Sequence, residues 1–572
     1  MCACKTIFSF RNIIQGGSTM AFYKGQPDII IRNGTIVDGT GKMPYYADIA
    51  VKGDRIDYIG NLKDVKAPLE IDAHHKYVTN GFIDSHSHSD RTVWAAPECL
   101  NAVSQGVSTE IVGNCGSSMY TPLAPDDFDP AGDGIDCAYN LQGPEYPKGC
   151  MAATLDKAEK MGVGVNMAWL CGHNDLRIMA DCYGPEPTVE QYKVMEDFID
   201  EAMQAGYIGF STGLEFLPGI ISAPQEVERL ASIAAKYDAN YCTHMRDEGT
   251  YIFEAVNEFL NVIRKTGMRG TISHLNVKYD NGVPNEYLQK CIQMLKDARE
   301  IEHLNVMCDM LSTTFATGRA MALLPPWLYE ESWKKAQETL ADPAGREKVK
   351  NDFCRYWRFL DNGQWDRMLY VQADYLPEVT SMTFQDIVKK AGKDPIDVFL
   401  DIMQAAPTLE AANSVHIQGK VFFEQQLIDS VVTDPIYMWQ TDSTVTSETG
   451  HISKITTNVQ NYMSMSYFFI RYVRDLRVIS IQDACKKVGM TPAHHFRLEK
   501  RGTLEIGNYA DINVFDLNAL KINATFADPC KYSTGMDYVI INGVPVIANG
   551  EIQHQRAGRV LRHLGHQNIH PL

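Results

Sequence analysis

The sequence predicts an α/β protein: a (β/α)8 TIM-like barrel with a small β-sandwich domain built from both termini. Two observations lead to this prediction. The middle of the chain alternates apolar strand-like runs with amphipathic helical stretches, the pattern of parallel strands joined by crossover helices. The two ends instead carry short alternating or β-branched runs, broken by Asn-Gly, Gly-Asp and Asp-Gly turn signals.

Residues 1–19, MCACKTIFSFRNIIQGGST, lack the continuous apolar core of a secretory signal, so we predict a disordered leader. Residues 20–78 contain DIIIRNGTIVDG and DIAVKGDRIDYIG, and residues 496–565 contain RGTLEIGNYADINVFD and DYVIINGVPVIANGE. Because both segments have the same β texture, we expect them to build the small domain together.

Residues 79–495 are predicted to form the barrel. Its eight strand-like runs are FIDSH, GVSTEIVGNC, GVNMAWLCGH, YIGFSTGLEF, ANYCTHMRDE, RGTISHLNV, LNVMCDML and PIYMWQTDS. A segment rich in Trp, Arg and Lys, from about Gly318 to Tyr375, follows the seventh run. Barrels keep their active-site loops at such positions, so we predict an insertion that acts as a lid.

Composition limits the classes of function. The chain has 572 residues, of which 45% are hydrophobic, as in ordinary globular proteins. Its net charge of −18 leaves no basic excess to neutralise phosphates, so we expect no nucleic-acid partner. No apolar run reaches the 18 or so residues of a membrane span, so we expect no membrane partner. Fourteen cysteines without a disulfide-like rhythm suit a reducing compartment, which predicts a cytoplasmic protein.

The stretch GFIDSHSHSD, residues 81–90, places His86 and His88 at the end of the first run. Residues i and i+2 of an extended strand point to the same side, so the two imidazoles can bind one metal ion. A lone histidine is more often a structural residue than a ligand. The metal interpretation therefore depends on further ligands elsewhere in the chain.

Such residues follow the carboxyl ends of four other runs: Cys115 after the second, His244 after the fifth, His274 after the sixth and Asp442 after the eighth. Barrel enzymes place their chemistry at this face, so the six side chains together favour a metal site. Imidazole, thiolate and carboxylate suit zinc better than calcium or magnesium. Six ligands exceed one tetrahedral shell, which admits two metal positions with Cys115 as a candidate bridge.

Seven motifs resemble those of the D-aminoacylase group of the amidohydrolase superfamily, the N-acyl-D-amino-acid deacylases: FIDSHSHSD, QGVSTEIVGNCG, GHNDLR, GFSTGLEFLPG, THMRDEG, ISHL and RGTLEIGNYADINVFD. The resemblance extends from about Asp28 to Arg559 and keeps the order of the motifs. It implies a zinc-dependent (β/α)8 barrel with a small β domain built from both termini.

The resemblance also implies a role for each candidate ligand. His86 and His88 would serve one metal position, and Cys115 would bridge two positions in place of the carboxylated lysine of many amidohydrolases. His244 and His274 would hold the tightly bound Zn²⁺, so one ion is expected, with room for a second.

Asp442 would act as the catalytic acid and base as well as a metal ligand. A bound Zn²⁺ lowers the pKa of its water to about 7 and polarises the scissile carbonyl. Asp442 would then take the proton of the attacking water and pass it to the departing nitrogen. The predicted function is zinc-dependent hydrolysis of the amide bond of a small molecule, an N-acyl-D-amino acid.

The positions that bind the substrate carboxylate in this group match poorly. The lysine expected two places after the sixth-strand histidine is Asn276, and the expected DxYPY pattern reads DMLST at 309–313. The HPR-type arginine expected past the catalytic aspartate is also missing from TDSTVTSETGHISKITTNVQ. His451 and Lys454 in that segment are candidates to contact the substrate instead.

Residues beside the ligands receive smaller roles. His173, at the end of the third run, is a candidate either for substrate contact or for a hydrogen bond behind the ligands. Glu248 belongs to the Arg-Asp-Glu sequence at 246–248, shortly after His244, which we expect to orient ligands. Glu215 lies in a glycine-bearing loop and is expected to have a structural role.

Two alternative functions stay open. The altered carboxylate positions favour a hydrolase of another linear or cyclic amide, as in hydantoinases. The cysteine bridge and the terminal motifs favour the N-acyl-D-amino acid. A non-catalytic scaffold that has kept the fold is disfavoured, because all the metal-type and acid/base residues are retained.

Overall fold

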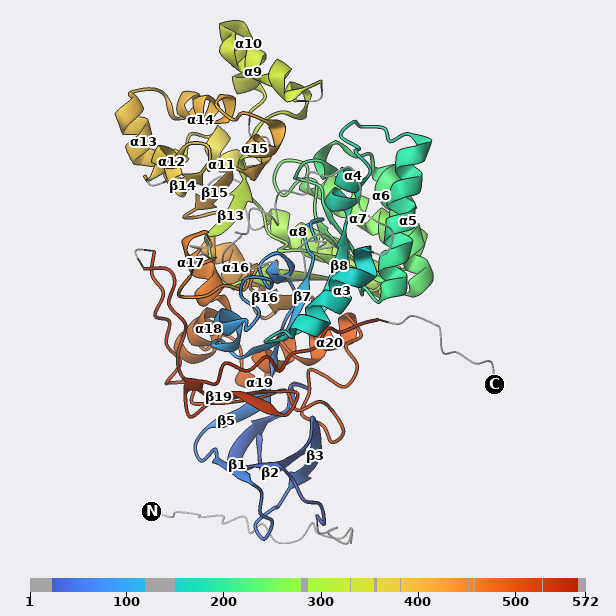
Figure 1. Cartoon of the computed structure of the whole chain (residues 1–572), viewed down its shortest axis with the longest axis vertical. Coiled ribbons are helices and arrows are strands. Elements are labelled where there is room, and N and C mark those ends of the chain that lie inside the picture. The colour runs from blue at the N-terminus through green and yellow to red at the C-terminus, as the bar shows by residue number, and fades with distance from the viewer. Residues whose placement is uncertain are drawn as a thin grey trace, which may run out of the picture.

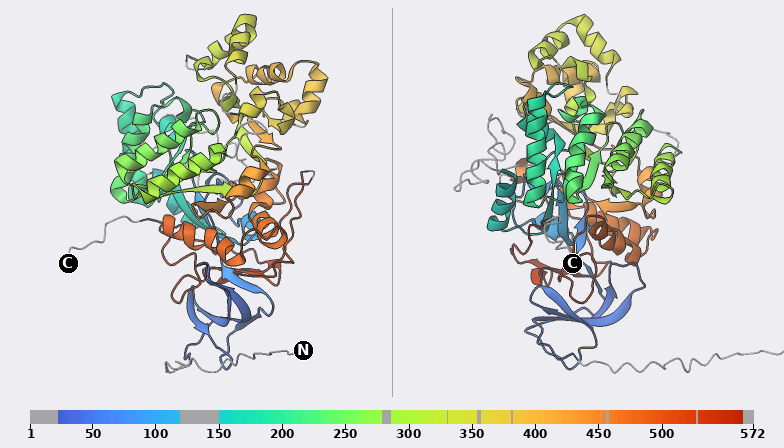
Figure 2. Two further views of the ribbon diagram at one scale, coloured as in Figure 1. Left: turned by 180° about the vertical axis from the view of Figure 1, so that it is seen from behind. Right: turned by 90° about the vertical axis from the view of Figure 1, so that its right-hand side faces the viewer.

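The computed structural model describes residues 23–118, 150–278, 286–329, 331–353, 357–380, 382–450, 452–455, 458–526 and 528–563. The predicted leader, residues 1–19, lies outside these ranges. A β domain occupies one end of the molecule, the barrel its middle and a lobe of short helices the other end (Figure 1). The views from behind and from the side show the same order (Figure 2).

Eight parallel strands form the barrel, and they coincide with the eight runs expected from the sequence: β6 (Phe82–Asp84), β7 (Val107–Val112), β8 (Asn166–Gly172), β9 (Gly209–Gly213), β10 (Asn240–His244), β11 (Arg269–Ile272), β12 (Val306–Leu311) and β16 (Tyr437–Gln440). They pair in chain order. A parallel bridge between Ser87 and Ser443 links the first and last strands just past their ends, so the barrel is nearly closed. The predicted fold class is confirmed.

The strand sequences are buried on both faces, which explains why they read as nearly continuous apolar runs. Every residue of β7, β8, β10 and β12 is buried. Parallel strands covered by helices have no solvent face, so they need no polar alternation. His244, the last residue of β10, is a buried polar residue at a carboxyl end.

Amphipathic helices cover the barrel: α1 (Leu100–Val103), α3 (Cys150–Met161), α4 (His173–Met179), α5 (Val189–Ala205), α6 (Pro224–Ala234), α7 (Ile252–Thr266) and α8 (Glu286–Glu300). A capping box of Thr188 and Gln191 begins α5, and Gly206, at φ 103°, ends it. Among the described residues, none of the helices combines the length and the apolar character needed to cross a bilayer.

The β domain is a nine-stranded sheet made from both ends of the chain. Its strands are β1 (Ile29–Val37), β2 (Tyr45–Lys52), β3 (Arg55–Gly60), β4 (Leu69–Asp72), β5 (Tyr77–Asn80), β17 (Ile512–Phe515), β18 (Met536–Ile541), β19 (Val544–Ala548) and β20 (Glu551–Ile552). The two ends meet where β5 pairs antiparallel with β17, with Val78 opposite Val514. Both valines are fully buried in the core of this domain.

The segment between β12 and β16 extends beyond the predicted insertion at 318–375. A three-stranded antiparallel sheet, β13 (Ala316–Arg319), β15 (His416–Gly419) and β14 (Met368–Gln372), ties its start to its end. Its helices are α9 (Trp333–Ala341), α10 (Pro343–Asn351), α11 (Arg358–Asp361), α12 (Pro377–Thr380), α13 (Phe384–Ala391), α14 (Pro395–Gln404) and α15 (Leu409–Ser414). We call residues 316–423 the insert.

The insert ends later than expected because helices such as α14 have the same amphipathic pattern as barrel helices. The chain then returns through α16 (Gln425–Val431) to β16 and continues into α17 (Ile452–Ile455), α18 (Ser464–Phe468), α19 (Ile481–Lys487) and α20 (Met490–His495). In Figure 1 the insert forms the lobe above the barrel.

Candidate metal centre

The predicted ligands lie together at the carboxyl ends of the barrel strands. His244 is the last residue of β10, and the others lie two to four residues past a strand end. Cys115, His274 and Asp442 have φ values of 52°, 37° and 49°. Positive φ is uncommon for residues other than glycine and is strained, so the backbone turns sharply where each of these side chains leaves its strand.

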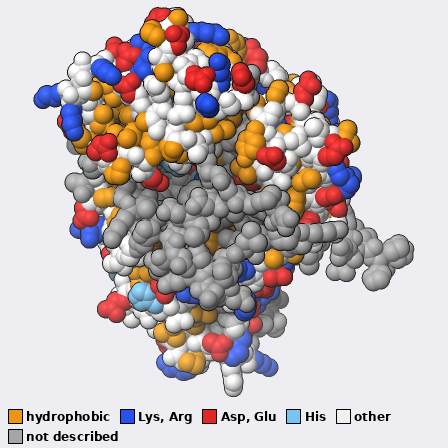
Figure 3. All heavy atoms as spheres, turned by 45° about the horizontal axis from the view of Figure 1, so that its top comes forward, with side chains coloured by type: hydrophobic (Ala, Val, Ile, Leu, Met, Phe, Trp, Pro, Cys, Tyr) orange, Lys and Arg blue, Asp and Glu red, His pale blue; other side chains and the backbone are white. Residues whose placement is uncertain are grey.

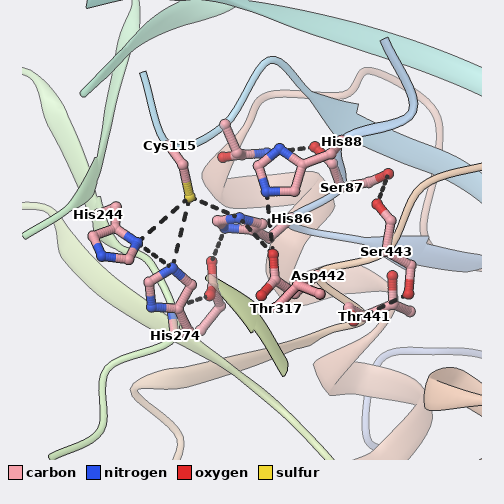
Figure 4. A network of polar contacts seen from close by, with 12 residues as sticks. His86, Ser87, His88, Cys115, His244, His274, Thr317, Thr441, Asp442 and Ser443 are labelled. Carbon is pink, nitrogen blue, oxygen red and sulfur yellow. Dashed lines mark hydrogen bonds and ion pairs between the residues drawn. The ribbon is translucent and has the colours of Figure 1, made fainter. Parts of the chain in front are cut away.

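The Cys115 sulfur lies at the centre of the cluster (Figure 4). Its Sγ is 3.4 Å from His86 Nε2, 3.8 Å from His244 Nδ1 and 3.7 Å from His274 Nε2. The facing nitrogens of His244 and His274 are 3.0 Å apart. Asp442 Oδ1 lies 3.5 Å from His86 Nε2 and 3.2 Å from His88 Nε2. The structure therefore brings all six predicted side chains into one cluster.

This geometry fits metal ions. Two groups of three have all their ligand atoms within 4.8 Å of one another: His86 with His88 and Cys115, and Cys115 with His244 and His274. Zinc bonds of about 2.0–2.3 Å in tetrahedral geometry require ligand atoms to lie about 3.3–3.8 Å apart, close to the distances found here. Because Cys115 belongs to both groups, two ions could share its thiolate.

The charges of the cluster favour ligation by a thiolate. Burial raises the pKa of the Cys115 thiol, but the imidazoles of His86, His244 and His274 outweigh burial and hold this pKa well below its usual range. Burial likewise lowers the pKa of His86, but the Cys115 thiolate and Asp309 raise it well above its usual value. Thiolates are the form of cysteine that binds metals.

Two buried carboxylates hold the imidazoles of His244 and His274 from behind. His244 Nε2 lies 2.7 Å from Glu215 Oε2, and His274 Nδ1 lies 2.9 Å from Glu248 Oε1. Each bond fixes a ring so that its other nitrogen faces Cys115, the usual arrangement of metal-binding histidines. The orienting role expected for Glu248 fits this position, and the supposedly structural Glu215 does the same for His244.

Lys278 is a further residue of the site, which the sequence did not indicate. Its buried Nζ lies 3.0 Å from Glu215 Oε2 and 2.8 Å from Glu248 Oε2. A third group of metal-type ligand atoms, Glu215 with His244 and Glu248, therefore already contains a cation, the ammonium of Lys278. The only signal in the sequence was a lysine four residues after His274, too far from the histidine for local spacing to link the two.

The three predicted substrate contacts have different outcomes. His173 is a correction: it is fully buried, its Nε2 lies 2.7 Å from Glu226 Oε1, and it is not among the described residues that line the cavity. Glu226 also pairs with Arg177, so the ring of His173 belongs to a buried ion-pair network. His451 lies outside the described residues, and Lys454 lies in α17, with its side chain also outside the description.

A cavity of about 790 Å³ opens onto the cluster, with His88, Cys115 and Asp442 in its wall. The barrel loops and the insert both contribute to the lining. The sequence did not indicate the cationic and aromatic lining residues, which among the described residues are Arg91, Tyr183, Phe216, Lys278, Arg319, Trp357, Phe422 and Phe423. On the described surface in Figure 3, charges of both signs are interspersed among hydrophobic side chains.

Comparisons with known proteins agree with this site. The Amidohydrolase family model matches residues 429–547, which include Asp442. Over 539 residues the chain is 29% identical to a D-aminoacylase of Alcaligenes xylosoxydans xylosoxydans, covering 93% of this chain and 97% of that protein. It is 27% identical to an N-acyl-D-glutamate deacylase of the same organism, covering 94% and 96% of the two chains.

Solved structures show the same fold. An N-acyl-D-glutamate deacylase from Bordetella bronchiseptica, complexed with zinc and a phosphonate inhibitor, has a TM-score of 0.74 and 25% identity, covering 94% of this chain and all of that one. A D-aminoacylase with a binuclear metal center has a TM-score of 0.73 and 24% identity, covering 94% and 99%.

Together with the barrel and the donor set, these similarities support a hydrolase that acts on amide carbon–nitrogen bonds. Within this class it resembles the D-aminoacylases over nearly its whole length, as its motifs predicted.

Proposed function

We propose that this protein is a zinc-dependent amidohydrolase that cleaves the amide bond of an N-acyl-D-amino acid. The observation that carries the proposal is the gathering of histidines from three strand ends within 3.8 Å of the Cys115 sulfur. The names of the relatives at 29% and 27% identity support the substrate class.

Each metal position has its own proposed set of residues. Cys115, His244 and His274 would hold one Zn²⁺, and His86, His88 and Cys115 would hold a second. The chemistry that zinc supplies when bound is polarisation of the scissile carbonyl and a lowered pKa for water.

Asp442 moves the proton. Burial raises the pKa of its carboxyl, but the hydrogen bond with His88 and the charges of His86 and His88 bring this pKa below its usual value. The carboxylate is therefore ionised at neutral pH and can accept a proton from the attacking water. It lies in the wall of the cavity, so it can then give this proton to the amide nitrogen, which leaves poorly unless it is protonated.

Two arginines are our candidates for recognition of the substrate carboxylate. Asn276, at the position of the expected lysine, is fully buried beside Met310 and is not among the described residues that line the cavity. Arg91, from the barrel, and Arg319, from the insert, do line it. A guanidinium grips a carboxylate at two points, which the ammonium of Lys454 could not do.

The test combines metal content with a substrate panel of N-acyl-D-amino acids, N-acyl-L-amino acids and cyclic amides. We expect purified protein to carry at least one equivalent of zinc and to hydrolyse the D series. Protein without zinc, or without activity on any amide, would contradict the proposal.

The second candidate function is hydrolysis of another linear or cyclic amide. It is favoured by Asn276 and by the residues DMLST, which lack the expected tyrosines. Turnover of cyclic amides alone would support it. In either case we propose a small-molecule amide as the partner and a reducing, cytoplasmic location, because no disulfide bond joins the cysteines that the structure describes.

A further inference from the structure

The insert reaches the metal centre through one tryptophan. Trp357 lies between β13 and β14, is only 1% exposed, and lines the cavity. Its indole Nε1 donates a hydrogen bond of 2.5 Å to Glu215 Oε1. The other oxygen of the same carboxylate binds His244. Two hydrogen bonds, through the carboxylate of Glu215, therefore connect Trp357 of the insert to the imidazole of His244, a candidate metal ligand.

Lys278 joins this connection to the second histidine. Its Nζ bridges Glu215 and Glu248, and it lies 5.8 Å from the centroid of the Trp357 ring. Glu248 in turn binds His274. Trp357, Glu215, Lys278 and Glu248 thus form one continuous network, which we call the rear network.

The burial of the rear network makes its partners dependent on one another. Glu215 and Glu248 are fully buried, and Lys278 is 5% exposed. Buried like charges without a cation between them repel each other, so loss of Lys278 would push the two carboxylates apart. This movement would release an imidazole from its fixed orientation, and disordered ligands bind a metal less tightly.

We propose that Lys278 and Trp357 are positioning residues that set the metal affinity of His244 and His274, and that Trp357 couples this affinity to the insert. The inference rests on the proposed function, because it requires the cluster to bind zinc. Coupling of this kind is reciprocal: if contact with the insert tightens zinc binding, zinc must stabilise that contact by the same factor.

The first experiment measures zinc affinity by competition with a chelator. Lys278→Met removes the ammonium and keeps an unbranched side chain, and Trp357→Phe removes only the indole N–H and part of the ring. We expect Lys278→Met to weaken zinc binding about 10- to 100-fold, the usual effect of removing an outer partner of a metal ligand, and Trp357→Phe to weaken it about tenfold or less.

The insert supplies a matched control for the tryptophan. Trp327 also donates its indole N–H to a carboxylate, that of Asp352 at 2.8 Å, but it is not among the described residues lining the cavity. Trp327→Phe should leave zinc affinity unchanged. Lys290, on α8 with its Nζ 3.9 Å from the ring centroid of Phe253, provides the matching control Lys290→Met.

The second experiment measures hydrogen exchange of the strands β13, β14 and β15 with and without zinc. Zinc should slow exchange in wild-type protein and in Trp327→Phe, and should slow it less in Trp357→Phe. A tryptophan that only fills space would not make the protection of the insert depend on zinc.

The outcomes separate the two proposals. Wild-type protein that binds no zinc would end the proposed function. Wild-type protein that binds zinc, with Trp357→Phe equal to Trp327→Phe in both experiments, would overturn the coupling. A folded Lys278→Met with wild-type affinity would overturn the role of Lys278. Circular dichroism checks that Lys278→Met folds. If it does not fold, the zinc affinity of Trp357→Phe tests the rear network alone, because Trp357 and Lys278 both act through Glu215.

Discussion

The two halves of the metal cluster share Cys115 but are supported in opposite ways. In the His244–His274 half, each ring is held from behind by a buried carboxylate, at 2.7 Å and 2.9 Å. In the His86–His88 half, the nearest carboxylate is Asp442, which lies on the cavity side at 3.5 Å and 3.2 Å. One half is built to hold its rings in place, and the other places its carboxylate where a substrate can meet it.

The buried carboxyls near the two halves also differ in their pKa values. Glu215 and Glu248 stay ionised although burial raises their pKa values, because Lys278 and the imidazoles lower both more strongly. Near the His86–His88 half, burial raises the pKa of Asp84 to about 7 and that of Glu110 to about 8. A buried carboxyl thus stays charged where nearby cations outweigh the effect of burial and takes up a proton more readily where burial prevails.

The largest effect is expected from removing the carboxylate on the cavity side. Asp442→Asn keeps the shape but cannot accept a proton, so we expect kcat to fall about 10²- to 10⁴-fold. Zinc bound by the His244–His274 half should remain, because its fixing carboxylates are untouched. Steady-state kinetics with metal analysis checks this expectation.

Asp374 provides the control for that variant. It is an exposed carboxyl that also lines the cavity, so Asp374→Asn should keep most of the activity. Normal turnover by Asp442→Asn would remove Asp442 from the mechanism.

The second prediction concerns the pH dependence of zinc affinity. Burial lowers the pKa of His274, but Glu248 and Cys115 raise it to about 10. In zinc-free protein the ring therefore keeps a second proton at pH 7, and metal must displace it. Below this pKa, affinity should rise about tenfold per pH unit for each proton released. Chelator competition at pH 6, 7 and 8 measures the slope, and an affinity independent of pH would contradict this account.

The third prediction concerns the carboxylate behind His274, whose removal makes the two halves more alike. Glu248→Gln removes the charge that holds His274, so zinc affinity should fall about 10- to 100-fold. Glu254→Gln, an exposed change in the first turn of α7, is the control and should have no effect. If both variants bind zinc equally, the carboxylate behind His274 does not prepare the site.

The smallest effect concerns stability near the His86–His88 half. Glu110 has a pKa of about 8 in the folded chain against its ordinary 4.5, so the folded state binds more protons between these values. Stability from this group is present at low pH and is lost as pH rises through about 8. Tm of zinc-free protein should fall by a few degrees between pH 5 and pH 9, since 1 kcal/mol moves Tm by only about 2–4 °C or less.

Glu110→Gln cannot ionise and should show a weaker fall in Tm over the same range. An identical fall in both proteins would show that Glu110 does not carry this dependence.

Local patterns sufficed for the barrel and for the ligand types. A parallel strand covered on both faces is an apolar run, and each ligand lies at its carboxyl end or within a few residues of it, so His86, Cys115, His244, His274 and Asp442 could be found in order. The end of the insert was missed, because its later helices carry the same amphipathic period as barrel helices. The pairing of His173 with Glu226 could not be foreseen, because the two residues lie 53 positions apart in the chain.

The sequence by itself determined the number of barrel strands, the joining of the two ends in one β domain and the donor types at the strand ends, because all of these depend on short-range periodicity and turn chemistry. Only the tertiary structure decided which nitrogen of each imidazole faces Cys115, and that Lys278 and Trp357 stand behind His244 and His274. Those contacts join residues from different strands and from the insert, 63 and 142 positions apart in the chain, and long-range packing alone sets their distances.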